Sequence, residues 1–232
     1  MFHDYFRTLS LAIRGIPRWG WTCIIAMSAA ATLFEQFVGR TLSTPEWIAL
    51  GVATVGAAFI YFAISIAASG ERPTLPRVLR YAAGATLLIA PVGALLLVLI
   101  LAVRSHQWWA LLFLVPAMLA LPFLLGVLSG WPLLQARAGR WIGLGAAWAA
   151  TKGLRWPLAI SSFAFGAMDR ATSDADLTKA TWVVASVLAW NCVVSVVSSA
   201  FGIGISVVAA RHMETVAAQS RGSTKSPGSS LS

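Results

Sequence analysis

Long apolar runs without regular polar interruptions dominate this chain. A transmembrane helix needs roughly 20 mostly apolar residues, and five stretches meet or approach that length. A sixth stretch is weaker, because its uncharged core is only Trp156–Met168. Strands of a membrane barrel alternate apolar and polar residues, whereas runs such as Leu95–Leu101 do not. The pattern therefore predicts an all-α, polytopic membrane protein with about six transmembrane helices: Trp21–Val38, Trp47–Ser69, Tyr81–Val103, Gln107–Gly130, Leu154–Ala171 and Thr181–Ala210.

The N-terminal segment, residues 1–18, is amphipathic rather than uniformly apolar. Arg7 and Arg14 share one face of a predicted helix, and apolar side chains recur on the other face at the i, i+3, i+4, i+7 spacing. The pattern predicts a helix that lies in the inner membrane interface; a partner-binding helix is the alternative. The apolar face consists of Phe2, Tyr5, Phe6, Leu9, Ile13 and Ile16.

Two connections between predicted spans have the same design, a helix stop followed by a basic amphipathic segment. In the first, Gly70 and Pro73 predict the end of one helix, and Thr74 predicts the start of the next. The second connection follows Trp131 and Pro132 and predicts another interfacial helix on the cytoplasmic side. The residues that share a face of that helix are Trp141, Leu144 and Trp148.

Composition and charge placement turn these spans into a topology. The chain is 58% hydrophobic and 11% charged, where a soluble domain carries about 25% charged residues, so a soluble enzyme is excluded. The net charge is +9, and 13 of the 17 Lys and Arg residues lie in the N-terminal segment, in the two basic connections just described and in the C-terminal tail. Cytoplasmic segments carry such an excess. We therefore expect a multi-pass protein of the bacterial inner (plasma) membrane with cytoplasmic N and C termini.

The same distribution argues against nucleic acid as a partner, because the basic residues are spread over four juxtamembrane segments instead of one aromatic-lined groove. Membrane lipids, anionic ones above all, are the expected partners, together with a membrane-protein partner or a second copy. Residues 19–213 form the predicted transmembrane domain. Residues 214–232, which end in a Ser- and Gly-rich stretch, are predicted to be a disordered cytoplasmic tail. The arginines that we expect at lipid headgroups are Arg77, Arg80, Arg137, Arg140 and Arg155.

The spans contain little polar chemistry. The three histidines are far apart in sequence, and Cys23 and Cys192 lie in different predicted spans, so we expect no metal, no cofactor and no catalytic residues. Glu35 and Asn191 are the intramembrane polar candidates. Small residues spaced four apart in the last span predict close helix packing against another span or a second copy: Ser195, Ser198, Ser199, Gly202 and Ser206.

The order of motifs resembles the YciC-like group of six-helix bacterial membrane proteins. It is also similar to the membrane domain found before some glycerophosphodiester phosphodiesterases. The resemblance covers roughly residues 60–165 and implies six helices with interfacial helices on the inner side, and it brings no catalytic residues. Ala147 stands where the family often has serine. The matching elements are Gly70-Glu71-Arg72-Pro73, Arg77–Arg80, Pro116, Pro132, Gly143–Trp148 and Thr151-Lys152-Gly153.

Three function classes follow from these observations. The leading one is a non-enzymatic accessory or scaffold protein that acts by packing with lipids or other membrane subunits. A small transporter or channel component is the second, and it requires a water-accessible path near Glu35, Asn191 or the spans that contain proline. A membrane-embedded lipid enzyme is the third, and it lacks an evident base or nucleophile.

Overall fold

The computed structural model describes residues 2–37, 44–106, 111–138, 141–168, 172 and 180–223. Within these ranges the chain is helical and has no β-strand, as the uninterrupted apolar runs predict. The helices are α1 (Phe2–Arg14), α2 (Arg18–Phe37), α3 (Thr44–Ala68), α4 (Leu75–Arg104), α5 (Leu111–Val127), α6 (Trp131–Ala138), α7 (Leu144–Ala150), α8 (Arg155–Met168) and α9 (Thr181–Ser223).

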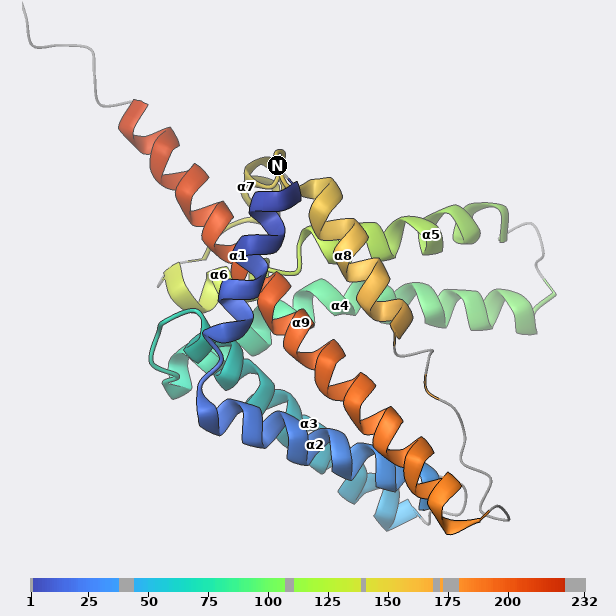
Figure 1. The fold of residues 1–232 in the computed structure, drawn as a ribbon. Helices are drawn as coiled ribbons and strands as arrows, with labels where there is room; N and C mark the ends of the chain where they lie inside the picture. The colour runs from blue at the N-terminus through green and yellow to red at the C-terminus, as the bar shows by residue number, and fades with distance from the viewer. Residues whose placement is uncertain are drawn as a thin grey trace, which may run out of the picture.

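The long helices extend from one end of the molecule, where α1, α6 and α7 lie (Figure 1). Helices α2, α4 and α8 run away from this end, and α3, α5 and α9 return to it. We call it the basic end, because α1 and α6 carry Arg7, Arg14 and Arg137 there. Helix α9 is central: α1, α2, α3, α6, α7 and α8 all contact it. The outer parts of α4 and α5 lie beside each other and away from α2 and α3.

Three described helices are long and apolar enough to cross a membrane: α3, α4 and the Thr181–Ala218 part of α9. Their burial differs sharply. Half of the most apolar window of α9 is buried inside the protein, but only 11% of that of α3 and 6% of that of α4. Helices α3 and α4 therefore present apolar surface outward, whereas α9 forms much of the core.

The prediction of six spans is thus met in part. Helix α8 is described over 14 residues, or about 21 Å, which is less than a hydrocarbon core of about 30 Å. The last residues of its predicted span, Leu154–Ala171, lie outside the described part of the chain. Helix α5 has 17 residues, and its predicted span begins at Gln107, outside the described residues. Helix α2 has 20 residues but carries Arg18 and Glu35 and several small polar side chains.

Helix α1 forms where the apolar stripe predicts it, but its stripe does not simply face lipid. Tyr5, Leu9 and Ala12 are buried, and α1 packs across α9. A Cβ atom on Gly204 of α9 would lie 2.8 Å from Leu9 Cδ1, so the missing side chain lets the two helices approach closely. Phe6 remains exposed. Part of the predicted membrane-facing stripe is therefore buried in the protein, and part of it faces outward.

Helix α6 is a buried element that the sequence pattern did not predict. All its residues from Trp131 to Ala136 are buried, and it packs against α4 and α9. Two glycines permit this: a Cβ on Gly84 would lie 3.0 Å from Pro132 Cα, and one on Gly130 would lie 2.4 Å from the Ala210 backbone nitrogen. The predicted second interfacial helix is correspondingly short, because residues 141–143 are not helical and α7 begins at Leu144.

The connection between α3 and α4 agrees with its sequence. Gly70 has φ of +93°, in the left-handed region that glycine adopts without steric cost, and it ends α3. Thr74 occupies the N-cap of α4, although its side chain makes no capping hydrogen bond. At the other end of the chain, α9 continues to Ser223, ten residues into the predicted disordered tail, residues 214–232. The helix therefore extends beyond the apolar span, and Glu214 in this extension pairs with Arg137 of α6.

Candidate functional site

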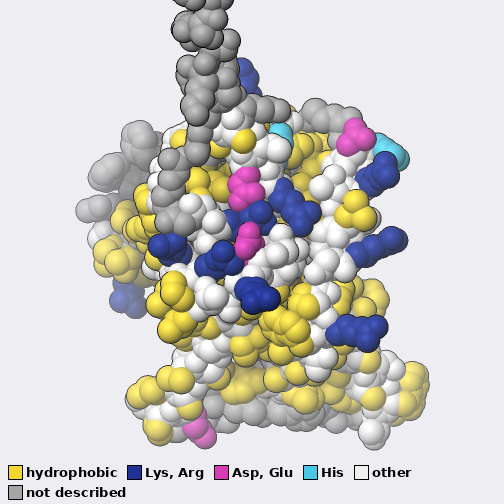
Figure 2. All heavy atoms as spheres, turned by 90° about the vertical axis from the view of Figure 1, so that its left-hand side faces the viewer, with side chains coloured by type: hydrophobic (Ala, Val, Ile, Leu, Met, Phe, Trp, Pro, Cys, Tyr) yellow, Lys and Arg dark blue, Asp and Glu magenta, His cyan; other side chains and the backbone are white. Residues whose placement is uncertain are grey.

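Charged side chains gather at the basic end, with acidic groups among them (Figure 2). The strongest pair joins α6 to α9: Arg137 Nε donates to Glu214 Oε1 at 2.6 Å. Arg137 is 16% exposed and Glu214 33% exposed, so water screens this pair only partly. Arg137 Nη1 also donates to the Ser69 carbonyl at 2.8 Å, and Arg211 Nη2 to the same oxygen at 3.3 Å. Three segments are therefore fixed together at this end.

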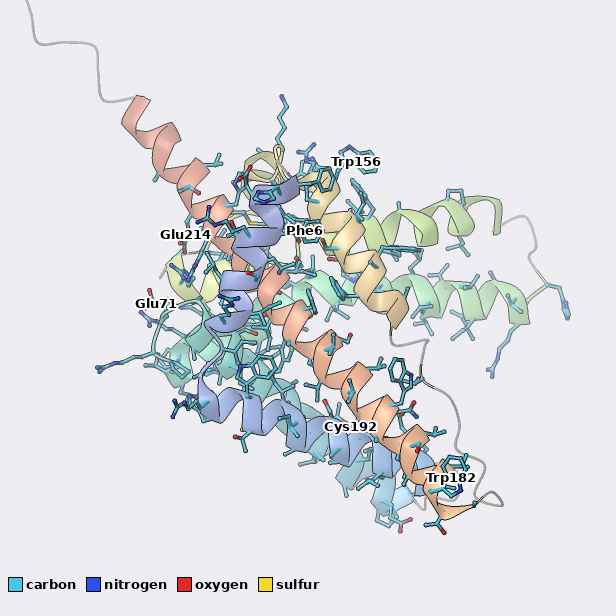
Figure 3. The ribbon with its side chains drawn as sticks, viewed as in Figure 1. Phe6, Glu71, Trp156, Trp182, Cys192 and Glu214 are labelled. Carbon is cyan, nitrogen blue, oxygen red and sulfur yellow. The ribbon has the colours of Figure 1, made fainter. Side chains whose placement is uncertain are left out.

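The other predicted headgroup arginines have different surroundings. Arg77 forms an ion pair with Glu71 at 2.8 Å and donates to the Arg72 carbonyl at 3.1 Å. Arg80 is exposed, and Arg140 lies outside the described residues. Figure 3 places Glu71 and Glu214 together at the basic end, with Trp182 at the far end of α9. The carboxylates thus offset part of the positive charge, which the count of basic residues alone does not show.

Arg155 connects α7 to the start of α8. Its guanidinium carbon lies 4.1 Å from the ring centroid of Trp148, and its Nη2 donates to the Trp148 carbonyl at 2.8 Å. This is a cation–π contact with a supporting hydrogen bond. Its Nε is buried and has no hydrogen-bond partner among the described residues. Arg155 therefore has both a structural role and an unused donor.

Trp131 and Gln135 form a polar contact that sequence reasoning missed. Trp131 Nε1 and Gln135 Nε2 each donate to the Ile142 carbonyl at 2.8 Å, and Gln135 Oε1 accepts from the Ile142 amide at 2.9 Å. Gln135 is 1% exposed. Its isolation among apolar residues was the available signal, because a buried amide side chain needs partners.

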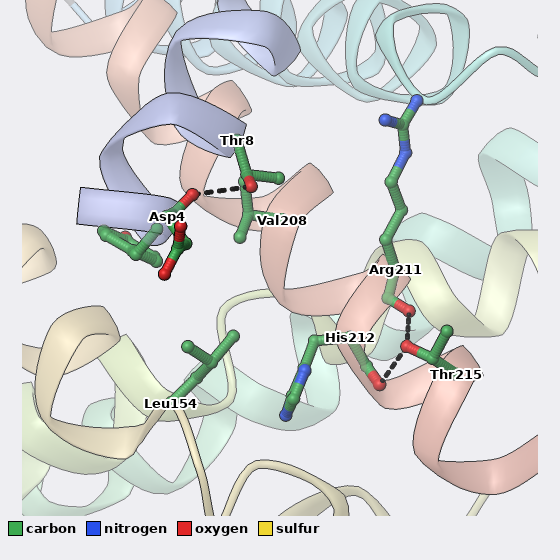
Figure 4. Close-up of a pocket in the computed structure, with 8 residues that line it drawn as sticks. Asp4, Thr8, Leu154, Val208, Arg211, His212 and Thr215 are labelled. Carbon is green, nitrogen blue, oxygen red and sulfur yellow. Dashed lines mark hydrogen bonds between the residues drawn. The ribbon is translucent and has the colours of Figure 1, made fainter. Parts of the chain in front are cut away.

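A groove of about 430 Å³ lies at the basic end between α1, the start of α8 and the C-terminal part of α9 (Figure 4). Asp4 and Thr8 line it from α1, and His212 and Thr215 from α9. The side chain of Arg211 points away from His212 and Leu154. Tyr5, another lining residue, carries a phenol that is neutral at physiological pH, and burial raises its pKa further. The groove therefore does not present a converging set of cations to an anion.

A second cavity, of about 230 Å³, lies where α3, α8, α9 and the turn after α5 meet. Five hydroxyl groups line it, and we call it the hydroxyl cavity: Tyr61, Ser129, Ser162, Ser198 and Ser206. Ser129 Oγ is buried and has no hydrogen-bond partner among the described residues. A Cβ on Gly202 would lie 2.8 Å from Tyr61 Oη, so glycine leaves space for this phenol beside α9.

The predicted small-residue positions of α9 face several neighbours. Ser195 Oγ donates to Ser28 Oγ of α2 at 3.1 Å. Ser198, Gly202 and Ser206 line the hydroxyl cavity, and Ser199 is half-buried. The same helix therefore packs within this chain along the positions that the spacing singled out, and part of that surface encloses a cavity.

The intramembrane candidates do not converge. Glu35 is exposed near the end of α2. Asn191 is half-buried on α9. Cys23 and Cys192 are both free thiols. Across the described ranges, no group of three or more His, Cys, Asp or Glu side chains is placed to hold a metal ion.

Comparisons with protein-family models, with curated proteins and with solved structures found no match to this chain. Over the residues that the structure describes, the chain is helical, and three of its helices are long and apolar enough to span a membrane.

Proposed function

We propose that this chain is a multi-pass protein of the bacterial inner membrane, with cytoplasmic N and C termini and about six membrane-inserted helices. We further propose that it is a non-enzymatic accessory protein that acts by associating with membrane lipids, anionic lipids at its basic end. The observation that carries the proposal is the contrast between a charged end and two long helices whose apolar side chains face outward.

The outward apolar surface is large. Val52 of α3 is 68% exposed, and Leu97 of α4 is 57% exposed, and neighbouring apolar residues of both helices are exposed with them. In water, contiguous apolar patches of this kind mark a membrane or protein contact. Lipid chains cover such surface without a further protein. Helices α2, α4 and α8 run opposite to α3, α5 and α9 (Figure 1). These alternating directions support insertion of α2, α5 and α8 beside α3, α4 and α9.

The charge at the basic end favours an anionic surface beside it. Arg7, Arg14 and Arg18 are exposed on α1 and the start of α2, and Arg80 is exposed on α4. Juxtamembrane Lys and Arg residues each contribute about 1 kcal/mol of attraction to anionic lipid. Arg77 and Arg137 are already paired with carboxylates, so we expect Arg80 and Arg155 to contribute more to headgroup binding than these two.

The lipid proposal is tested by retention of phosphatidylglycerol against phosphatidylcholine in nanodiscs. The double variant Arg80→Gln/Arg155→Gln should lower the phosphatidylglycerol preference at least threefold. Arg104→Gln is the matched control, because Arg104 is an exposed arginine at the opposite end of α4, and it should leave the preference unchanged. Equal retention by all three proteins would contradict headgroup binding at the basic end.

The topology is tested with a reporter enzyme that is active only in the periplasm. A fusion after Ser232 should be inactive, and a fusion after Ser105, at the far end of α4, should be active. Activity of the Ser232 fusion would overturn both the topology and the six-span architecture.

We also propose membership of the YciC-like group, on the motifs between residues 60 and 165.

A small transporter or channel component is the second candidate function, and the hydroxyl cavity is the observation that favours it. Such a role requires water to reach the cavity through the membrane. Ser198→Cys in a variant without the native Cys23 and Cys192 tests this with a membrane-impermeant maleimide. Labelling would favour transport, whereas protection from the reagent would favour a lipid-associated role.

A further inference from the structure

The hydroxyl cavity has an unusual chemical character for the interior of a membrane protein. Its five hydroxyl groups come from four segments of the chain, and the apolar side chains of Phe165 and Ile205 complete its wall. The lining contains no Asp, Glu, Lys, Arg or His among the described residues. An ionic ligand would lose its hydration there without a counter-charge. The cavity therefore suits an uncharged ligand with oxygen atoms.

One hydroxyl in the cavity indicates an absent partner. Ser129 Oγ is buried and makes no hydrogen bond within the described part of the chain. Leaving a buried polar group unpaired is unfavourable, and a ligand oxygen would satisfy Ser129 Oγ once the atoms that now enclose it move aside. Phe165 stacks on Phe201 of α9 with ring centroids 3.9 Å apart, which holds the Phe165 ring in the wall of the cavity.

The depth of the cavity selects among uncharged ligands. Arg211 marks the charged boundary on α9, and Ser206 and Ser198 precede it by five and 13 residues. At 1.5 Å per residue they lie about 8 Å and about 20 Å along the helix from that boundary. The hydroxyl groups thus lie below the headgroup layer of a bilayer with a core of about 30 Å. Phosphate groups rarely reach this depth, whereas oxygens of neutral lipids do.

The size of the cavity also favours the polar group of a neutral lipid. A volume of about 230 Å³ is below the roughly 300–1,000 Å³ of sites that enclose a whole drug-sized molecule. It accommodates a small polar group whose hydrocarbon chains remain outside among α5, α8 and the surrounding lipid. Ser162 belongs both to this cavity and to an apolar groove with Pro122 and Phe163, which offers a path for such a chain.

We infer that the hydroxyl cavity binds the uncharged polar group of a neutral membrane lipid, whose hydroxyl or carbonyl oxygens bond to Tyr61, Ser129, Ser162 and Ser198. This inference rests on the proposed membrane insertion of α8 and α9. It deepens the proposed function, because it adds a neutral-lipid site to the anionic contacts at the basic end. Diacylglycerols and isoprenoid quinones share the required chemistry.

The test is native mass spectrometry of the full chain released from nanodiscs that contain dioleoylglycerol, ubiquinone-2 or phosphatidylglycerol. The wild type should retain one molecule of dioleoylglycerol or of ubiquinone-2. Ser162→Ala/Ser198→Ala should weaken that retention at least tenfold, because two hydroxyl groups are lost. Ser186→Ala is the matched control: Ser186 is an exposed serine of the same helix whose Oγ donates to the Trp182 carbonyl. It should retain lipid as the wild type does.

Ser129→Ala provides a variant that should fold, since it removes a buried group without a partner. It should also weaken neutral-lipid retention, with an unchanged melting temperature. Preference for one neutral lipid would identify the source. The inference is overturned if the wild type retains neither neutral lipid, or if the alanine variants retain them equally. It also fails if the double variant loses phosphatidylglycerol to the same extent. Loss of neutral lipid alone leaves the basic-end proposal intact, and Arg80→Gln/Arg155→Gln tests that proposal separately.

Discussion

Gly130 is the position where a single methyl group should perturb the fold most directly. It precedes α6, and a Cβ atom there would lie 2.4 Å from the Ala210 backbone nitrogen and 2.5 Å from Ala209 Cβ. Ordinary contacts between such atoms are about 3.5–4.0 Å, so α6 and α9 would have to separate by about 1 Å. The atoms met belong to a helix backbone, which cannot turn aside as a flexible side chain does.

The expected cost of Gly130→Ala follows from this geometry. Adding a methyl group to a packed core costs about 1–3 kcal/mol, and backbone contact puts this site at about 3 kcal/mol. The lower entropy of the unfolded alanine chain offsets about 0.4–1 kcal/mol of that. A net loss of about 2–3 kcal/mol corresponds to a fall in melting temperature on the order of 4–12 °C for a chain of this size.

Thermal unfolding in detergent micelles, followed by circular dichroism, measures this effect. Gly51→Ala and Gly56→Ala are the matched controls, because both glycines lie in α3 and a Cβ on either would meet no atom within 4 Å. Alanine is favoured over glycine in a helix by about 0.5–1 kcal/mol, so these variants should melt at or slightly above the wild-type temperature. The reasoning is refuted if Gly130→Ala melts within about 1 °C of the wild type, because for a chain of this size so small a shift corresponds to less than about 0.5 kcal/mol.

Four further predictions concern other contacts of the fold. A double-mutant cycle of Arg137→Ala and Glu214→Ala should give a coupling of about 1–2 kcal/mol in denaturant unfolding, because the pair is largely shielded from water; additive effects would show that the pair contributes nothing. Glu71→Gln should cost less than about 1 kcal/mol, because its pair with Arg77 is one-third exposed, and salt that fails to reduce this small effect would contradict the explanation. Gln135→Leu should cost about 1–3 kcal/mol by leaving the Ile142 amide without its partner, and a stable variant would mean that water replaces the amide. Gly204→Leu should displace α1 from α9 and increase hydrogen exchange at residues 5–14, since even a Cβ there lies 2.8 Å from Leu9; unchanged protection would show that α1 does not depend on this close approach.

The helical character of the chain and the approximate positions of its long helices follow from the amino-acid sequence alone. Apolar runs of spanning length can only be helical in lipid, because every backbone polar group must find its partner within the segment. The turn at Gly70 and the start of α4 after Thr74 were also predictable, since both depend on local backbone preferences. The amphipathic period of α1 predicted its helix for the same reason.

Which side of each helix is buried depends on long-range packing, which local sequence patterns do not reveal. The stripe of α1 fits a membrane interface and a protein groove equally well, and Gly204 on a distant helix decides in favour of burial for Leu9. The sequence pattern places α6 in a surface connection. Its burial is not evident from that pattern, because it depends on the hydrogen bonds of Gln135 to Ile142, seven residues away, and on close contact with α9. The hydroxyl groups of the cavity come from segments more than 100 residues apart, so no local pattern could bring Tyr61 and Ser198 together. Periodicity fixes local conformation through the backbone, whereas the assembly of a site depends on contacts between residues that sequence spacing does not relate.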